Sequence, residues 1–148
     1  MKVAIASDHR GVDCKKEVIK YLEENNHEVI DCSPINTDTD DYPDFAFKVC
    51  EKVTTKEADI GILVCRTGIG MSIAANKVKG IRCAKVDSVE DAILCRNDNA
   101  ANVMTFNFTK SIKEIDEIIE AFINADVLTN ERHARRVKKI MDYEKEKN

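Results

Sequence analysis

The feature that most constrains the fold is residues 60–72, which read IGILVCRTGIGMS. The segment begins as an uninterrupted apolar run, which is typical of a parallel strand buried on both faces. The run ends at Cys65, after which Gly68 and Gly70 allow the backbone to turn sharply into a helical pattern. The first N–H groups of a helix lack partners within it, so this turn favours binding of an anion. The segment therefore predicts a strand, a ligand-binding loop and a helix, in that order.

Strand-like and helix-like segments alternate along the rest of the chain, which predicts an α/β fold with a parallel sheet and right-handed crossovers. We expect strands over residues 2–7, 28–32, 59–65, 81–86 and 102–106. We expect helices over residues 12–25, 45–55, 70–77, 87–95, 112–124 and 130–145. The prediction is one domain, residues 1–148, built as a doubly wound, three-layer α/β/α sandwich around a five-stranded parallel sheet.

Charge and cysteine content narrow the classes of function. The net charge of -4 gives no electrostatic reason to expect a nucleic-acid partner. No apolar run approaches the ~18 residues that a membrane helix needs, and the first apolar run is too short for a signal peptide. We therefore expect a cytoplasmic protein without a membrane partner. The six cysteines form no C-x-x-C pair, which disfavours a zinc site or a thioredoxin-type redox pair.

The last predicted helix, residues 130–145, carries charge on most of its surface and a narrow apolar stripe at Val137, Ile140 and Met141. Such a helix covers its own sheet poorly, so we expect it to pack on a partner subunit. Arg132 and Arg136 are four residues apart and share one helical face. Two guanidinium groups placed in this way suit a phosphate, although a solvated basic face would have the same pattern.

Several motifs resemble the type B ribose-5-phosphate isomerases, which belong with the galactose-6-phosphate isomerase subunits. The motifs are Ser7-Asp8-His9, Asp41-Tyr42-Pro43-Asp44, the run from Cys65 to Lys77, Ala101-Asn102-Val103 and the run from Arg132 to Val137. The resemblance implies a Rossmann-like or flavodoxin-like sandwich that forms a homodimer or tetramer. It also implies aldose–ketose isomerisation of a phosphorylated sugar, without a metal or another cofactor, at active sites shared between subunits.

The resemblance also implies roles for the residues of the glycine turn. Cys65 matches the base that moves a proton between C1 and C2, through an enediolate; the alternative is a buried structural cysteine. The backbone amides of Arg66, Gly68, Ile69 and Gly70 are expected to receive the enediolate oxygen, each such donor being worth ~3 kcal/mol. Thr67 matches a residue that assists proton movement at the sugar oxygens, and its alternative role is a helix cap.

The other implied roles fall at three places in the chain. Asp8 and His9 are expected to hold the sugar hydroxyls and ring oxygen, although Asp8 could instead cap the first helix. Tyr42 is expected either to close over the substrate or to serve as packing. The neighbouring subunit is expected to supply Asn99 and a group that binds the phosphate, which comprises Arg132, His133 and Arg136.

The chain departs from the family pattern at positions that matter for chemistry. Asp98 stands where the family usually has a histidine that opens the sugar ring, so Asp98 is the expected catalytic replacement; the alternative is that His9 opens the ring alone. Thr109 stands where a phosphate-binding arginine is usual, while Arg66 and Arg10 replace small residues. We therefore hypothesise that an added arginine replaces the lost cation, and that the preferred sugar differs from ribose 5-phosphate.

Four further functions compete with the leading prediction of a ribose 5-phosphate isomerase. One is an isomerase of allose 6-phosphate or galactose 6-phosphate, and another is a sugar-phosphate binder without activity. A cysteine phosphatase is disfavoured because Met71 stands where that chemistry needs an arginine. A nucleotide-binding module is disfavoured because no G-x-G-x-x-G motif follows the first strand.

Overall fold

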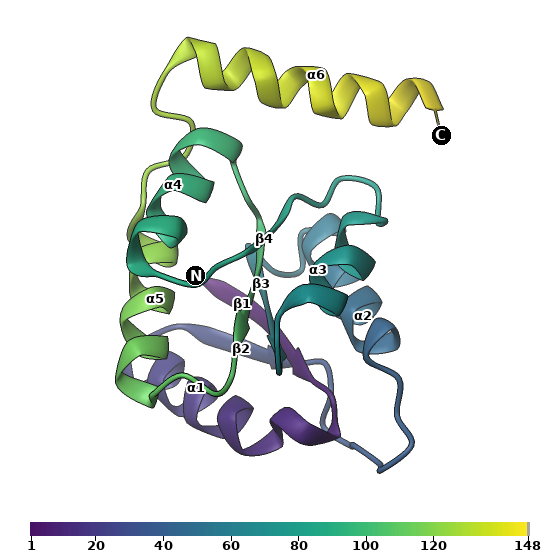
Figure 1. The fold of residues 1–148 in the computed structure, drawn as a ribbon, viewed down its shortest axis with the longest axis vertical. Coiled ribbons are helices and arrows are strands. Elements are labelled where there is room, and N and C mark those ends of the chain that lie inside the picture. The colour runs from purple at the N-terminus through teal and green to yellow at the C-terminus, as the bar shows by residue number, and fades with distance from the viewer. Residues whose placement is uncertain (148) are drawn as a thin grey trace.

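The computed structural model describes residues 1–147, and within them five parallel strands form one sheet (Figure 1). The strands are β1 (Lys2–Ser7), β2 (Glu28–Asp31), β3 (Ile60–Cys65), β4 (Cys83–Lys85) and β5 (Val103–Asn107). Their spatial order is β2-β1-β3-β5-β4. The chain leaves β1 toward one edge of the sheet and returns to build the other side from β3. In such a sheet, ligands bind beyond the carboxyl ends of the strands at this switch point.

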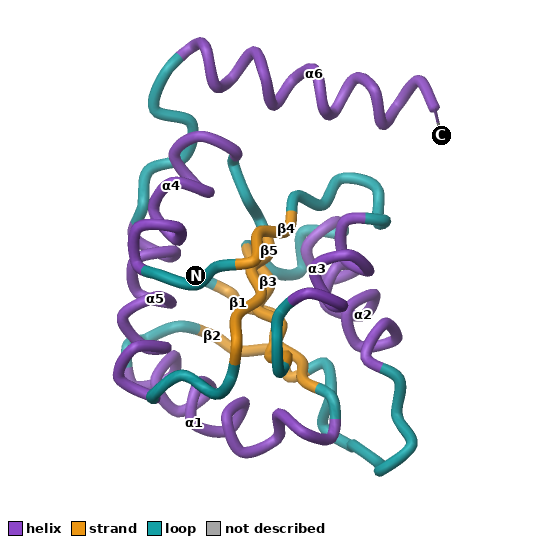
Figure 2. Tube along the Cα trace, viewed as in Figure 1, coloured by secondary structure: helices purple, strands orange, loops and turns teal. Residues whose placement is uncertain are grey.

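Helices cover both faces of the sheet and give the predicted three layers (Figure 2). They are α1 (Val12–Glu24), α2 (Tyr42–Thr54), α3 (Ile69–Asn76), α4 (Val89–Asn99), α5 (Ile112–Asn124) and α6 (Glu131–Lys147), and a 3-10 turn, η1 (His9–Gly11), precedes α1. One core lies between the sheet and α1, α4 and α5, and a second lies between the sheet and α2 and α3. The predicted doubly wound α/β/α sandwich is confirmed.

Strand β3 is the centre of both cores, since all six of its residues are buried. At Gly61, even one added methyl carbon would lie 2.5 Å from Val49 Cγ1, so α2 can approach the strand only because no side chain stands there. The register pairs Ser7 with Val64 and Cys65 with Asn107. The ends of β1, β3 and β5 therefore meet at one edge of the sheet.

Three predicted boundaries were wrong. Helix α2 begins at Tyr42 rather than near residue 45, because Pro43 fits the first helical turn, where its missing N–H is not needed. Strand β4 is shorter than residues 81–86, since the Arg82 N–H donates to the Asn102 side chain instead of a strand. Helix α4 continues past Cys95 to Asn99 and ends where Ala100 adopts a left-handed φ of 50°.

Helix α6 lies apart from the other layers, across the edge of the sheet where the strands begin (Figure 1). Among its described residues, Val137 is the one that is buried, whereas Ile140 is 56% exposed and Tyr143 is 65% exposed. The Glu144 carboxylate accepts a hydrogen bond from the Gly80 N–H, 2.9 Å away, just before β4. Over residues 1–147, no helix is both long and apolar enough to cross a membrane.

Candidate functional site

The turn after β3 brings the sulfur-bearing end of the strand against the start of α3. Cys65 is 9% exposed, and its carbonyl accepts a hydrogen bond from the Phe108 N–H, which ties the turn to the end of β5. The Thr67 hydroxyl accepts a hydrogen bond from the Ile69 N–H at 3.1 Å. Thr67 lies one residue before Gly68, the N-cap of α3, so its hydroxyl satisfies the first N–H of the helix without being the cap itself, and its side chain is exposed. Helix α3 begins at Ile69, four residues after Cys65, and the first N–H groups of a helix have no partners within it.

Two neighbours explain why this turn is built from glycines. Gly68 has a φ of +79°, and its carbonyl accepts a hydrogen bond from the buried Thr105 hydroxyl at 2.8 Å. A methyl carbon added to Gly70 would lie 2.7 Å from the ring of Tyr42. The Tyr42 ring therefore lies directly against the turn, at the edge of the predicted substrate site. The turn is thus contacted by Thr105, which follows it in the sequence, and by Tyr42, which precedes it.

The end of β1 is fixed by a carboxylate that the sequence analysis did not select. The Asp40 carboxylate lies 2.7 Å from His9 Nδ1 and also accepts the His9 backbone N–H at 3.2 Å. Burial alone would raise the pKa of Asp40, but hydrogen bonds from His9, Asn36 and Thr37 outweigh burial and lower it to about 2. Asp8 accepts a hydrogen bond from the Arg10 N–H at 3.0 Å, so its alternative role as a cap is realised in η1.

Three cations lie near this edge of the sheet. Arg10 and Arg66 are exposed, as they must be if one of them is to replace the cation lost at Thr109. Lys85, which the sequence analysis did not select, passes beside the turn: its Cγ would lie 3.3 Å from a methyl carbon on Gly68. Its ammonium group is paired with Asp87 at 2.7 Å. Thr109 donates its hydroxyl to Asn107 and carries no charge into the site.

Five of the predicted residues lie at the opposite edge of the sheet. Asp98 and Asn99 are in the last turn of α4, and α6 carries Arg132, His133 and Arg136. Asp98 Oδ1 lies 3.3 Å from His133 Nε2, so two residues predicted to have separate roles form a pair. Arg132 and Arg136 are exposed. Within one chain, these five residues are not brought to Cys65.

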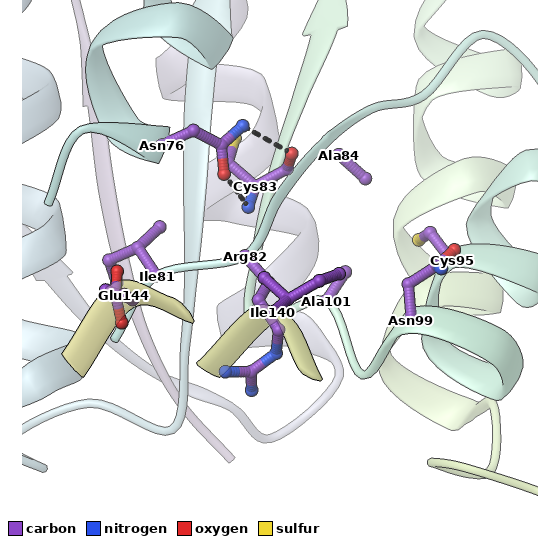
Figure 3. Close-up of a pocket in the computed structure, with 10 residues that line it drawn as sticks. All are labelled: Asn76, Ile81, Arg82, Cys83, Ala84, Cys95, Asn99, Ala101, Ile140 and Glu144. Atoms are coloured by element: carbon purple, nitrogen blue, oxygen red, sulfur yellow. Dashed lines mark hydrogen bonds between the residues drawn. The ribbon is translucent and has the colours of Figure 1, made fainter. Parts of the chain in front are cut away.

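A cavity of about 360 Å³ opens between α6 and this edge (Figure 3). Asn99 of α4, Ile140 of α6 and Arg82, just before β4, are among the residues that line it. The Asn76 side chain both donates to the Cys83 carbonyl and accepts from its N–H (Figure 3). Burial raises the pKa of the Cys83 thiol to about 12, so this cysteine stays protonated and unreactive at neutral pH.

The candidate site therefore consists of two separate groups. We call Asp8, His9, Asp40, Tyr42, Cys65, Thr67 and the Gly68–Gly70 turn the strand-end group, and Asp98, Asn99, Arg132, His133 and Arg136 the helix-end group. The first sits on buried strands, whereas the second sits on helix α6 and the α4 terminus. Among residues 1–147, no three His, Cys, Asp or Glu side chains are grouped so that they could hold a metal ion.

Comparison with known proteins gives matches along the whole chain. A family model described as Ribose/Galactose Isomerase matches residues 3–140. A Bacillus subtilis (strain 168) protein, provisionally named a sugar phosphate isomerase, is 44% identical over 149 residues, which cover 100% of this chain and 99% of that one. The structure of Clostridium thermocellum ribose-5-phosphate isomerase B has a TM-score of 0.94 at 39% identity, with 100% of both chains covered. The structure of Mycoplasma genitalium ribose-5-phosphate isomerase B with bound ribulose-5-phosphate has a TM-score of 0.90 at 41% identity, and the match covers 98% of this chain and 97% of that one.

Proposed function

Because the chain belongs to the ribose/galactose isomerase family, and is thus a sugar-phosphate isomerase of the ribose-5-phosphate isomerase B type, we propose that it interconverts ribose 5-phosphate and ribulose 5-phosphate. The Mycoplasma genitalium relative, at 41% identity, binds ribulose-5-phosphate in its crystal structure, which supports this choice of substrate. The observation that carries the proposal is the position of Cys65, at the end of the central strand and four residues before the start of α3.

The isomerisation requires a base for one carbon-bound proton and donors for the oxygen that becomes negative. In the proposal, Cys65 carries the proton between C2 and C1, and the amides of Arg66, Gly68 and Gly70 stabilise the enediolate oxygen, because the Ile69 N–H already donates to Thr67. Preorganised amides are worth ~3 kcal/mol each at such a site. The Thr67 hydroxyl, which already accepts the Ile69 N–H, keeps its proton free to donate to a sugar oxygen.

We propose that a second copy of the chain supplies the helix-end group to each site. The support is geometric, since these residues lie at the far edge of their own sheet, on a helix whose apolar side chains Ile140 and Tyr143 are exposed. In this arrangement the partner subunit's Arg132 and Arg136 bind the phosphate with His133, and Asn99 contacts the sugar. A dimer with two shared sites is the smallest assembly that meets this requirement.

Two groups are candidates for opening the furanose ring, and each has one observation in its favour. Asp98 stands at the family position and lies 3.3 Å from His133, so the two could pass a proton between them. His9 lies at the end of the strand next to Cys65, and its ring is held by Asp40. Acyclic substrates distinguish ring opening from the enediolate step.

The preferred sugar is the finer point of the proposal. Arg66 and Arg10 are exposed at the strand ends, and Thr109 brings no charge. This substitution pattern supports the alternative that allose 6-phosphate or galactose 6-phosphate is turned over as well. Turnover of the three sugar phosphates by the wild type and by Arg66→Gly tests it, and unchanged KM values for all three would exclude a role for Arg66.

We also propose that no metal takes part, so dialysis against a chelator should leave turnover unchanged.

The decisive experiment replaces the proposed base. Cys65→Ala should lower turnover of ribose 5-phosphate by about 10³-fold, as expected for loss of a positioned base, and should stop exchange of solvent deuterium into ribulose 5-phosphate. Cys32→Ala is the matched control, because Cys32 is also buried, at 8% exposure, but follows strand β2, which β1 separates from β3. Full activity in Cys65→Ala would end the proposal, and a wild type that exchanges no deuterium would indicate a binder without activity.

A further inference from the structure

Asp40 reaches the site from a loop that lies 31 residues beyond His9. Its side chain is 9% exposed, and four donors surround its two oxygens. Oδ1 receives His9 Nδ1 at 2.7 Å and the His9 backbone N–H at 3.2 Å. Oδ2 receives Asn36 Nδ2 at 3.0 Å and the Thr37 N–H at 3.2 Å. Because Asn36 also donates to the Ser7 carbonyl, the loop is anchored to the end of β1.

These contacts fix which nitrogen of His9 carries the proton. The pKa of Asp40 is lowered to about 2, so the group is a carboxylate at neutral pH and has no proton to donate. The short contact with His9 must therefore be a hydrogen bond from Nδ1–H to the carboxylate. In the neutral ring, Nε2 is then left as an acceptor. His9 is 31% exposed, so this nitrogen remains accessible to a substrate.

The position of His9 relative to the base supports a role in the same reaction. Ser7 pairs with Val64 across β1 and β3, so His9 and Cys65 follow the ends of two adjacent strands, which in a sheet are ~4.8 Å apart. Asp98, which the proposed arrangement brings to the site from a second copy of the chain, is paired with His133 at 3.3 Å.

We infer that Asp40 is a positioning residue that holds His9 as the proton carrier for opening the sugar ring, a role that rests on the proposed function. Ring opening breaks the bond between C1 and O4, removes the proton of the O1 hydroxyl and delivers a proton to O4. Neutral His9 accepts the O1 proton at Nε2 and returns it to O4 as the aldehyde forms, so no proton is gained or lost. Asp40 stabilises the transient imidazolium, in the manner of other histidine–carboxylate pairs.

The experiment separates ring opening from the enediolate step. Ribulose 5-phosphate is acyclic because its C5 oxygen carries the phosphate, so deuterium exchange at its C1 needs no ring opening. In Asp40→Asn, an NH₂ group replaces one of the two carboxylate oxygens, and at both places it would face hydrogen-bond donors. The His9 tautomer is then no longer fixed. We expect turnover of ribose 5-phosphate to fall by about 10²-fold, with deuterium exchange within about 3-fold of wild type. Nitrogen-15 NMR of the imidazole should report loss of the Nδ1–H tautomer.

The controls keep each outcome informative. Asp38→Asn, in the same exposed turn, should match the wild type in both assays. His9→Asn keeps an amide donor for Asp40 but no proton carrier, so it should reproduce the split between turnover and exchange even if Asp40→Asn folds poorly. The inference is overturned if Asp40→Asn and His9→Asn leave turnover intact, if exchange falls as much as turnover, or if Asp98→Asn produces the split instead. Absence of exchange in the wild type would instead overturn the proposed function.

Discussion

The strand-end group and the helix-end group contain comparable chemistry but are built in different ways. Cys65 and the glycine turn are continuous with a strand that is buried along its whole length, and Thr105, Tyr42 and Asp40 hold the surrounding loops. Helix α6, which carries the arginines, buries Val137 among its described residues and exposes Ile140 at 56%. The strand-end group is held in place by contacts within its own chain, whereas the helix that carries the arginines of the helix-end group leaves apolar side chains exposed.

The difference matches the positional accuracy that each group needs within a single chain. A base must lie within hydrogen-bonding reach of its proton, and packing of the strand can provide that accuracy. A phosphate can be held by charge-assisted hydrogen bonds from two long arginines. We therefore expect the helix-end group to be positioned only when a second copy covers α6.

The largest effect is expected when the two groups are damaged in separate chains. At a substrate concentration well below KM, Cys65→Ala and Arg136→Ala homo-oligomers should each lose at least about 10²-fold of turnover, the first through the lost base and the second through the lost phosphate contact. If the sites are shared, a mixed dimer holds one doubly damaged site and one intact site, so equal mixing of unfolded and refolded chains should restore about a quarter of wild-type activity. Turnover after co-refolding measures this, and no recovery would assign both groups to one chain.

The next effect addresses the phosphate. Arg136→Ala should raise KM for ribose 5-phosphate by about 10²-fold, since a hydrogen bond between charged groups contributes ~2–3 kcal/mol. Arg135→Ala is the matched control, because Arg135 is equally exposed but occupies a different helical face. Steady-state kinetics at two salt concentrations checks the result. Equal effects of the two substitutions would reduce the helix-end group to a general basic surface.

A pair of glycine substitutions compares the core of β3 with the turn that follows it. Gly61→Ala places a methyl carbon 2.5 Å from Val49 in the core and should cost about 1–3 kcal/mol of unfolding free energy. Gly70→Ala meets the ring of Tyr42, which is 40% exposed and able to move. It should cost less than about 1 kcal/mol in stability but lower turnover about 10-fold by displacing Tyr42 from the substrate. Urea denaturation and turnover assays measure both effects.

The sequence predicted what depends on local pattern. The apolar run of β3 and the glycine turn that leads into α3 follow from residue types close together in the chain. The end of α4 was predicted too early, because Asn97, Asp98 and Asn99 are weak helix formers. They stay helical where Arg82 and Arg96 donate to the carbonyls of Ala100 and Ala101, and this support comes partly from another element.

The candidate site shows the same division. Cys65 and Thr67 follow from their place after a buried strand, whereas Asp40 lies in a loop rich in turn residues, where one more aspartate carries no signal. Its contact with His9 depends on the path of that loop across the end of β1, which Asn36 fixes. The pairing of Asp98 with His133 likewise depends on how α6 crosses α4. Neither distance in the chain nor residue type encodes these two contacts.

The smallest predicted effect tests how firmly the strand-end group is held, through pH. The pKa of Asp40 is lowered from 3.8 to about 2 in the folded state, so its contribution to stability is present above pH ~4 and disappears as the pH falls through about 2. Asp40→Asn should therefore be less stable than wild type by about 1 kcal/mol at pH 5, after allowance for solvent screening. The difference should shrink between pH 4 and pH 2 in urea denaturation, while Asp38→Asn follows the wild type throughout. A stability difference that is constant with pH would mean that lost packing, and not loss of the ionised carboxylate, destabilises Asp40→Asn. The firm hold on the strand-end group would then not depend on the charge of Asp40.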